Sequence, residues 1–210
     1  DAQIDHIHAL LDANTPVLIN GFGGIGKTAL AAETAYQRLG RGEGDVLWLH
    51  VGGAGLQGAL VRLAEPIGLE REVTRASSIG DAAFLIQEKL AAAGLGLLVL
   101  DNVWWSYQDF SWFINHIVPP DLPLLITARN RYALRGGEVI VLDDLASDDG
   151  LAVLAHHAGV NIETLRHDPA ARALCASLGN LPLALEIAGN NLALNGIPPA
   201  KLLARIEKAI

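Results

Sequence analysis

The chain has 210 residues and a formal net charge of −8, with 18% charged and 51% hydrophobic residues. This composition excludes a disordered tail, a collagen and a coiled coil, and it is typical of a compact globular protein. The acidic balance, without any run of Lys or Arg, argues against nucleic acid or an anionic membrane as the main partner. The same charge favours a soluble monomer for this piece of protein.

Cysteine content and chain ends bear on where the protein works. The single cysteine, Cys175, cannot form an internal disulfide, so we expect a cytoplasmic location. The most apolar run, residues 91–100, is only about half as long as a membrane span. The chain starts at Asp1, contains no Met and stops at Ile210 within a helical pattern, so we expect it to be a piece of a longer protein.

The first two thirds of the chain alternate short apolar runs with longer amphipathic stretches, which predicts an α/β fold. Most of the runs are apolar on both faces, as in a parallel sheet that is covered by helices. The expected strands are Val17–Asn20, Val46–Val51, Leu97–Asp101, Leu124–Thr127 and Val139–Leu142. The expected helices between them are Lys27–Leu39, Leu56–Ile67 and Asp81–Ala93.

After residue 142 only helix signals recur, so we expect a small helical domain. Ser147 is the expected cap of a first helix, and Asp168 before Pro169 caps another. Pro182 begins a helix that closes near Gly196, and Pro198 with Pro199 opens the last. The predicted domains are therefore 1–143 and 144–210, joined at an acidic connection.

The strongest chemical signal is the sequence GFGGIGKT at residues 21–28, which fits the phosphate-binding pattern G-x-x-x-x-G-K-[ST]. A predicted apolar strand precedes this segment and a predicted helix follows it. This order lets the backbone amides of the loop and the N-terminus of the helix surround phosphate groups. Lys27 is expected to reach the β- and γ-phosphates, and the Thr28 hydroxyl to bind Mg²⁺. The nucleotide-binding residues expected here are Gly23, Gly24, Ile25, Gly26, Lys27, Thr28 and Ala29. The alternative is a glycine-rich turn that binds nothing.

Two further strand ends carry polar residues that suit phosphate chemistry. Asp101 ends the apolar run LLVLD and is the candidate acid on the metal side. Asn102 follows where many hydrolytic proteins of this wider class have a second acid, and an amide orients water without accepting its proton. Arg129 is placed to report a third phosphate, because its guanidinium pairs with phosphate oxygens. The alternative for Arg129 is a solvated arginine in a basic turn.

Four sequence segments, in their order and spacing, closely resemble the motifs of NB-ARC domains, which belong to the STAND class of signal-transduction ATPases. The segments are GFGGIGKTAL at 21–30, LLVLDNVW at 97–104, LLITARN at 124–130 and GNLPLAL at 179–185. The resemblance implies a P-loop NTPase fold, with a parallel five-stranded sheet in the order 5-1-4-3-2 followed by a four-helix domain. The proposed boundary at Asp143 agrees with that arrangement.

The resemblance also assigns roles to residues. Residues 21–28 match the Walker A motif, Asp101 matches the metal-side acid of Walker B, and Arg129 matches the sensor arginine. Pro182, followed by Leu183, matches the G-x-P motif, which in the family packs near the adenine. The cofactors implied are ADP or ATP with Mg²⁺. Asn102 departs from the two acids that the family often has, which puts turnover in doubt.

The leading functional prediction is an ADP/ATP switch whose nucleotide state controls domain orientation and assembly, with slow or impaired hydrolysis. Its partners would be flanking regulatory and effector domains, and the full-length protein would oligomerise with ATP. One alternative is a structural module with permanently bound ADP. Another is a P-loop small-molecule kinase, although an arginine-rich lid is lacking apart from the cluster Arg129, Arg131 and Arg135. A GTPase is disfavoured because no N-K-x-D signature occurs.

Among residues outside this site, the aromatic stretch 104–113 invites two interpretations. Its three tryptophans and Phe113 form either a partner surface or part of the core, and we expect core packing. Cys175 has no basic neighbour in sequence that would activate its thiol.

Overall fold

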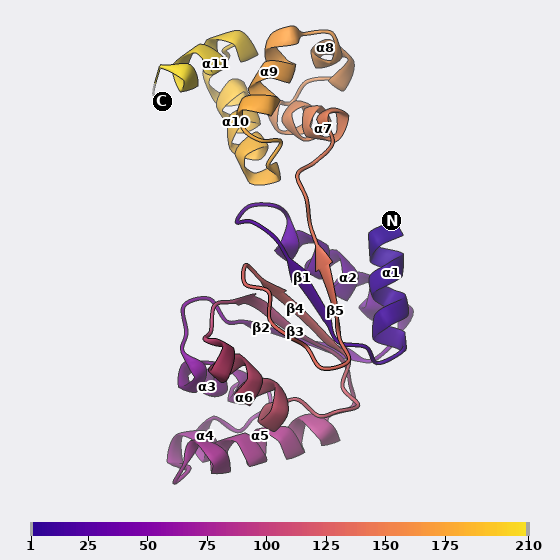
Figure 1. Cartoon of the computed structure of the whole chain (residues 1–210), viewed down its shortest axis with the longest axis vertical. Coiled ribbons are helices and arrows are strands. Elements are labelled where there is room, and N and C mark those ends of the chain that lie inside the picture. Colours follow the sequence, from indigo (N-terminus) through magenta and orange to yellow (C-terminus); the bar gives the residue numbers. More distant parts are fainter. Residues whose placement is uncertain (1, 209–210) are drawn as a thin grey trace. The chain divides into compact units, whose positions relative to one another are not determined.

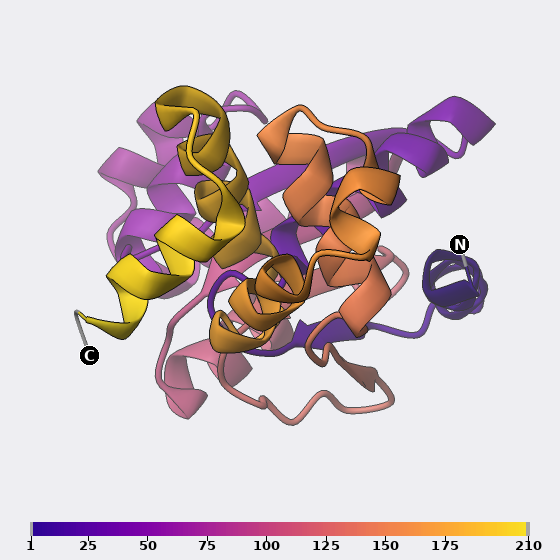
Figure 2. The same ribbon diagram turned by 90° about the horizontal axis from the view of Figure 1, so that it is seen from above.

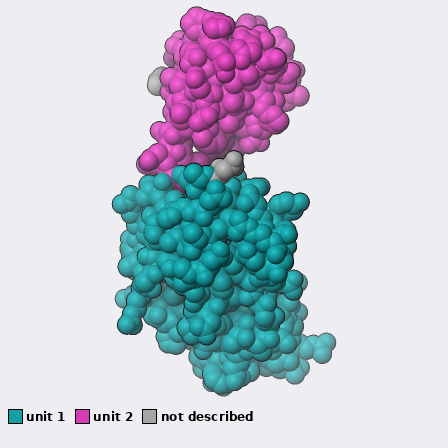
Figure 3. Space-filling view, turned by 90° about the vertical axis from the view of Figure 1, so that its right-hand side faces the viewer, with its two compact units in different colours: residues 1–21, 27–141 teal, residues 22–26, 142–210 magenta. Residues whose placement is uncertain are grey.

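A computed structural model describes residues 2–208, so Asp1, Ala209 and Ile210 lie outside the described part. The chain divides into two compact units, which Figure 3 shows in different colours. The first unit combines the residues up to Gly21 with Lys27–Val141, and the second combines Phe22–Gly26 with the chain from Leu142 onward. The domain assignment 1–143 and 144–210 stays a prediction.

Five parallel strands form the sheet of the first unit, in the order β2-β3-β4-β1-β5 (Figure 1). Read from the other edge this is 5-1-4-3-2, so the predicted fold class is confirmed. The strands are β1 (Val17–Asn20), β2 (Asp45–His50), β3 (Leu95–Val103), β4 (Leu124–Ala128) and β5 (Glu138–Val141). All five lie within two residues of the predicted runs.

Strand β3 is longer than its apolar run predicts. It continues past Asp101 to Val103, and its register with β4 shifts between Leu100 and Val103. Asn102 has a φ of +60°, a left-handed conformation that asparagine tolerates better than most residues. This irregularity lies directly after Asp101 and changes the path of the backbone from Asn102 onward.

Register explains how the two faces of the sheet are used. Leu18, Leu98 and Ile126 lie on one face, where they join a buried cluster with side chains from α3, α5 and α6. The alternate residues point to the opposite face, where α1 and α2 lie (Figure 1). The helices are α1 (Ala2–Asp12), α2 (Lys27–Arg41), α3 (Leu56–Ala64), α4 (Glu70–Arg75), α5 (Ile79–Ala92) and α6 (Tyr107–Ile117).

Helix α6 begins where a serine can cap it. The Ser106 hydroxyl accepts a hydrogen bond from the Asp109 amide, and Phe110, Phe113 and Ile117 then recur on the buried face. Trp105, just before the helix, is buried and its ring lies 4.8 Å from that of Phe113, so core packing is confirmed for these two aromatics.

Trp104 departs from that expectation of core packing. The residue is 53% exposed, and it lies just after Val103, the last residue of β3.

The second unit contains helices and no strand among its described residues (Figures 1 and 2). Four helices have nine or more residues, and α8 is a short fifth. They are α7 (Ser147–Ala158), α8 (Ile162–Arg166), α9 (Pro169–Ser177), α10 (Pro182–Asn195) and α11 (Pro199–Glu207). Within residues 2–208, each helix lacks the length or the apolar character that crossing a membrane requires.

Most predicted ends of these helices are confirmed. Asp168 accepts a hydrogen bond from the Ala170 amide at 2.8 Å and so caps α9. Gly196 closes α10 in the left-handed conformation, with φ of +58°. The prediction that Ser147 caps α7 is wrong: Ala146 occupies the cap position without a side-chain bond, and Ser147 is the first helical residue.

Packing in the second unit depends on a close approach of α7 and α10. A Cβ added at Gly189 of α10 would lie 2.7 Å from the Cβ of His157 and 2.8 Å from the Leu154 carbonyl oxygen. Cys175 lies in the same buried cluster, and burial raises the pKa of its thiol to about 11. It is therefore an unreactive thiol at neutral pH, as its sequence context indicates.

We predict that Gly189→Ala lowers the free energy of unfolding of the helical unit by about 1–3 kcal/mol, because the added methyl group forces α7 and α10 apart. Cys175 provides the measurement, since its thiol is buried and is the only one in the chain. Modification by a disulfide reagent should become faster in urea as the helical unit opens, and the variant should reach half-maximal rate at lower urea.

Gly40→Ala on α2 is the matched control. Nothing lies within 4 Å of a Cβ added there, so we expect a neutral or slightly stabilising effect. All four tryptophans belong to the first unit, so their fluorescence reports its unfolding separately. Equal urea midpoints for Cys175 modification in Gly189→Ala and the unmodified protein would show that the close approach does not limit stability.

Candidate functional site

The loop after β1 has the backbone that its glycines predict. Gly24 and Gly26 have φ values of +79° and +103°, which side chains with a Cβ rarely adopt. The chain then enters α2 at Lys27, so the first amides of a 15-residue helix follow the loop directly. The backbone amides at a helix N-terminus and the positive end of the helix dipole are features that bind phosphate.

Lys27 is held at the start of α2. Its side chain is buried, and its Nζ donates a hydrogen bond to the Gly21 carbonyl at 2.8 Å. Burial lowers the pKa of Lys27, the positive charge of Arg129 lowers it further, and the negative charge of Asp101 opposes both. Lys27, Arg129 and Asp101 therefore lie near enough to one another for their charges to interact.

Asp101 is the centre of the polar network. Its side chain is almost fully buried, and its Oδ1 accepts hydrogen bonds from the Thr28 hydroxyl at 2.8 Å and the Thr127 hydroxyl at 2.7 Å. Its Oδ2 lies 2.8 Å from Nδ1 of His50. The sheet makes this possible, because His50 and Asp101 are register partners at the carboxyl ends of β2 and β3.

The donor set suits a magnesium ion. Thr28 and Asp101 present a hydroxyl and a carboxylate oxygen 2.8 Å apart, and Mg²⁺ prefers such hard oxygen ligands, completed by water and phosphate. Thr127 donates to the same oxygen of Asp101 and so helps to orient it, as a residue that supports a metal ligand often does. These residues fit the cofactor that the sequence predicts.

Asn102 has its side-chain oxygen engaged. The indole N–H of Trp104 donates to Asn102 Oδ1 at 2.6 Å, and the backbone N–H of Asn102 donates to the Thr127 hydroxyl at 2.8 Å. An indole N–H only donates, so the atom that it contacts must be the amide oxygen. The other end of the Asn102 side chain is therefore its NH₂ group, which can only donate hydrogen bonds.

Arg129 lies at the end of β4, exposed to solvent. Its guanidinium carbon is 4.7 Å from the centroid of the Trp104 ring, within the range of a cation–π interaction. Asn20, at the end of β1, donates to the Arg129 carbonyl at 2.9 Å and so fixes the backbone there. The backbone that carries the Arg129 side chain is therefore held by β1.

The structure brings five predicted residues of the first unit together: Lys27, Thr28, Asp101, Asn102 and Arg129. Ala29 is exposed in the first turn of α2. Gly23, Gly24, Ile25 and Gly26 belong to the second unit, as do Pro182 and Leu183. Within that unit the Leu183 amide donates to the Gly24 carbonyl at 3.2 Å. Pro182 is the first residue of α10.

Sequence reasoning missed His50, Thr127, Asn20 and Trp104 as members of the site. The first three share a signal, since each is a polar residue at the carboxyl end of a predicted strand. Polar residues at these ends collect along one edge of a parallel sheet. Trp104 gave a conflicting signal, because large aromatics usually pack in the core.

No family model matches the chain. It is similar to the regulatory protein AfsR of Streptomyces griseus, with 30% identity over 83% of this chain and 18% of that protein. AfsR of Streptomyces coelicolor is likewise 30% identical, over 82% of this chain and 17% of its own length. The chain spans less than a fifth of these curated relatives.

Solved structures share the fold. A STAND protein with a tetratricopeptide repeat sensor from Pyrococcus horikoshii matches 86% of this chain and 28% of its own, with a TM-score of 0.55 and 22% identity. Cdc6p from Pyrobaculum aerophilum matches 93% of this chain and 62% of its own, with a TM-score of 0.66 and 15% identity.

A third solved structure was determined with a nucleotide analogue. AMPPCP-bound DnaA from Aquifex aeolicus matches 99% of this chain and 64% of its own, with a TM-score of 0.61 and 15% identity. The sheet order, the phosphate-loop sequence and these structures together show that the chain has a P-loop NTPase fold, which it shares with the STAND protein from Pyrococcus horikoshii and with DnaA.

Proposed function

We propose that this domain is an ADP/ATP-binding switch of the NB-ARC type within a larger signalling regulator. The observation that carries the proposal is the Thr28–Asp101 hydrogen bond beside a buried Lys27, since these are the groups that would hold Mg²⁺ and phosphate. The AfsR relatives, which are regulatory proteins several times longer than this chain, support a role in regulation. The flanking regulatory and effector domains are its proposed partners.

In this proposal the chain's residues divide the work of binding. The amides of Gly23–Thr28 surround the phosphates, and Lys27 pairs with the β- and γ-phosphate oxygens. Thr28 and Asp101 hold Mg²⁺, which when bound offsets phosphate charge. Arg129 pairs with the third phosphate and so distinguishes ATP from ADP. Adenine is favoured over guanine because no N-K-x-D signature occurs and a protein of this fold was solved with AMPPCP.

Slow hydrolysis forms part of the proposal. An attacking water needs a proton acceptor, and Asn102 supplies none, because a side-chain amide is not basic enough to take up a proton as a carboxylate does. Binding depends on other groups and is not weakened by this arrangement. A long-lived ATP state suits a switch that assembles only when the third phosphate is present.

The switch requires that ADP and ATP favour different arrangements of the domains, since a ligand shifts an equilibrium only through its differential affinity. We propose that Pro182 and Leu183 provide the helical domain's response. The contact of Leu183 with Gly24 supports this, because Gly24 belongs to the phosphate-binding sequence. We further propose a cytoplasmic, monomeric domain whose full-length protein oligomerises with ATP.

The inability of Asn102 to take up a proton also favours a second candidate, a structural module with permanent ADP. Chromatography of nucleotide released from the denatured protein, after incubation with labelled ATP, distinguishes the two. A switch exchanges its nucleotide, whereas a structural module retains unlabelled ADP.

We predict that Lys27→Ala weakens binding of ADP and ATP by about 10- to 100-fold, because a charge-assisted contact to phosphate is lost. Isothermal titration calorimetry measures both affinities. Lys89→Ala on α5 removes the same charge from an exposed position and should bind as the unmodified protein does. Unchanged affinity in Lys27→Ala would refute phosphate binding at this loop.

Replacing Asn102 by Asp should raise steady-state phosphate release by about 10- to 100-fold, because the new carboxylate keeps one oxygen free to accept a proton while the other binds Trp104. A coupled phosphate assay measures the rate. The double variant Lys27→Ala with Asn102→Asp must lose this activity, which excludes a contaminating ATPase. A variant no faster than the parent would show that Asn102 does not limit turnover.

Pro182→Ala should weaken ADP binding and reduce any nucleotide-dependent change in shape, because it loosens the start of α10. Calorimetry gives the affinity, and small-angle X-ray scattering with ADP and ATP gives the shape. Pro169→Ala is the control, since Pro169 also opens a helix in this unit. If both variants behave as the parent protein does, the coupling assigned to Pro182 is wrong.

A further inference from the structure

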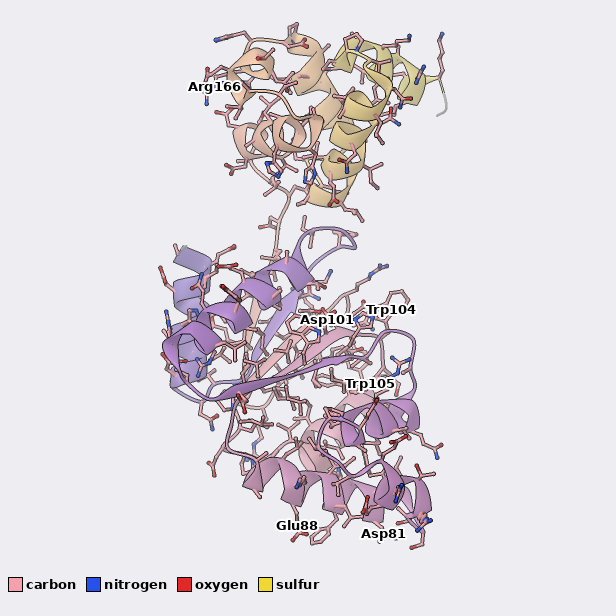
Figure 4. The ribbon with its side chains drawn as sticks, turned by 180° about the vertical axis from the view of Figure 1, so that it is seen from behind. Asp81, Glu88, Asp101, Trp104, Trp105 and Arg166 are labelled. Atoms are coloured by element: carbon pink, nitrogen blue, oxygen red, sulfur yellow. The ribbon has the colours of Figure 1, made fainter. Side chains whose placement is uncertain are left out.

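Trp104 is placed unusually for a large aromatic side chain. It is 53% exposed, whereas Trp105, the next residue, is 5% exposed and donates its indole N–H to the Ala54 carbonyl. Figure 4 shows Trp104 at the same end of the sheet as Asp101. An exposed indole gains little from burial, so its position must be maintained by other interactions.

One of these interactions fixes the ring through its polar edge. The indole N–H of Trp104 donates to Asn102 Oδ1 at 2.6 Å, and the backbone N–H of Asn102 donates to the Thr127 hydroxyl. Thr127 donates to Asp101 Oδ1 at 2.7 Å. The orientation of the indole is thus linked, through three hydrogen bonds, to the carboxylate on the metal side.

The other interaction uses the face of the ring. The Arg129 guanidinium carbon lies 4.7 Å from the ring centroid. Arg129 is exposed, and its positive charge and that of Lys27 repel each other. Without a phosphate, that repulsion and the entropy of a long side chain would move the guanidinium into solvent. The electron-rich face of the indole opposes both effects.

We propose that Trp104 is a positioning residue that holds Arg129 ready for the third phosphate and thereby sets the preference of the site for ATP over ADP. The inference rests on the proposed nucleotide-binding function and deepens it. Trp104 itself touches no phosphate in this proposal. Its contribution is that the Arg129 side chain is already partly ordered, so it loses less conformational entropy when a nucleotide with a third phosphate binds.

The test compares the ratio of ATP to ADP affinity in the whole chain, measured by calorimetry with Mg²⁺. We expect Trp104→Ala to lower this ratio by about 3- to 10-fold, mainly through weaker ATP binding, as loss of a cation–π contact of about 1 kcal/mol implies. Trp104→Phe keeps a ring face and loses the N–H anchor, so its ratio should lie between those of the parent and Trp104→Ala. Phe84→Ala, which removes another exposed aromatic, is the control.

A double-mutant cycle separates positioning from a structural effect. In an Arg129→Ala background, Trp104→Ala should change the ratio no further, because the group that it positions is gone. A structural defect would instead weaken ADP and ATP alike in both backgrounds. The change in tryptophan fluorescence on adding ATP should also shrink in Trp104→Phe and persist in Trp112→Phe.

The possible failures are distinguishable. A parent protein that binds neither nucleotide overturns the proposed function, and this inference with it. A parent that binds both nucleotides equally overturns the role of Arg129 and hence of Trp104. Two results overturn the Trp104 inference alone. One is a preference for ATP that is unchanged in Trp104→Ala. The other is an effect of Trp104→Ala on the ratio that is equally large with and without Arg129→Ala.

Discussion

The arrangement of the site depends on holding one carboxylate in a place with little water. Asp101 is 3% exposed, and a buried charge is costly unless it is paired or hydrogen-bonded. Thr28, Thr127 and His50 supply those partners from α2, β4 and β2. Strand β3 must therefore lie between β2 and β4, which is the order observed. The strand order of the sheet is thus what brings the hydrogen-bond partners of Asp101 together.

Local patterns were enough to predict most elements of this fold. The apolar runs located all five strands, because central parallel strands are buried on both faces and need no alternation. The glycines of the phosphate loop and the prolines at 169, 182 and 199 marked helix starts for reasons of backbone geometry alone. Ser147 misled because its neighbour Ala146 can occupy a cap position without any side-chain bond.

The site contacts that could not be predicted from the sequence depend on the pairing of segments that are distant along the chain. His50 contacts Asp101 only because β2 and β3 align in one register, which brings together residues 51 positions apart. Thr127 depends similarly on β4 and its alignment with the end of β3. Trp104 could not be placed because burial depends on what surrounds a side chain, and β3 ends just before it. A list of polar strand ends would have named the first two without saying which atoms meet.

The overall charge of the protein bears on how such a site can attract nucleotide. A net charge of −8 repels phosphate at long range, and the sequence has no basic run to offset it. At physiological salt, however, charges farther apart than about 8 Å are largely screened, so only nearby groups decide the local potential. There burial and the nearby charge of Arg129 lower the pKa of Lys27, and the helix terminus adds its partial charge. The phosphate affinity that we propose therefore comes from short-range groups, and it is compatible with an acidic protein.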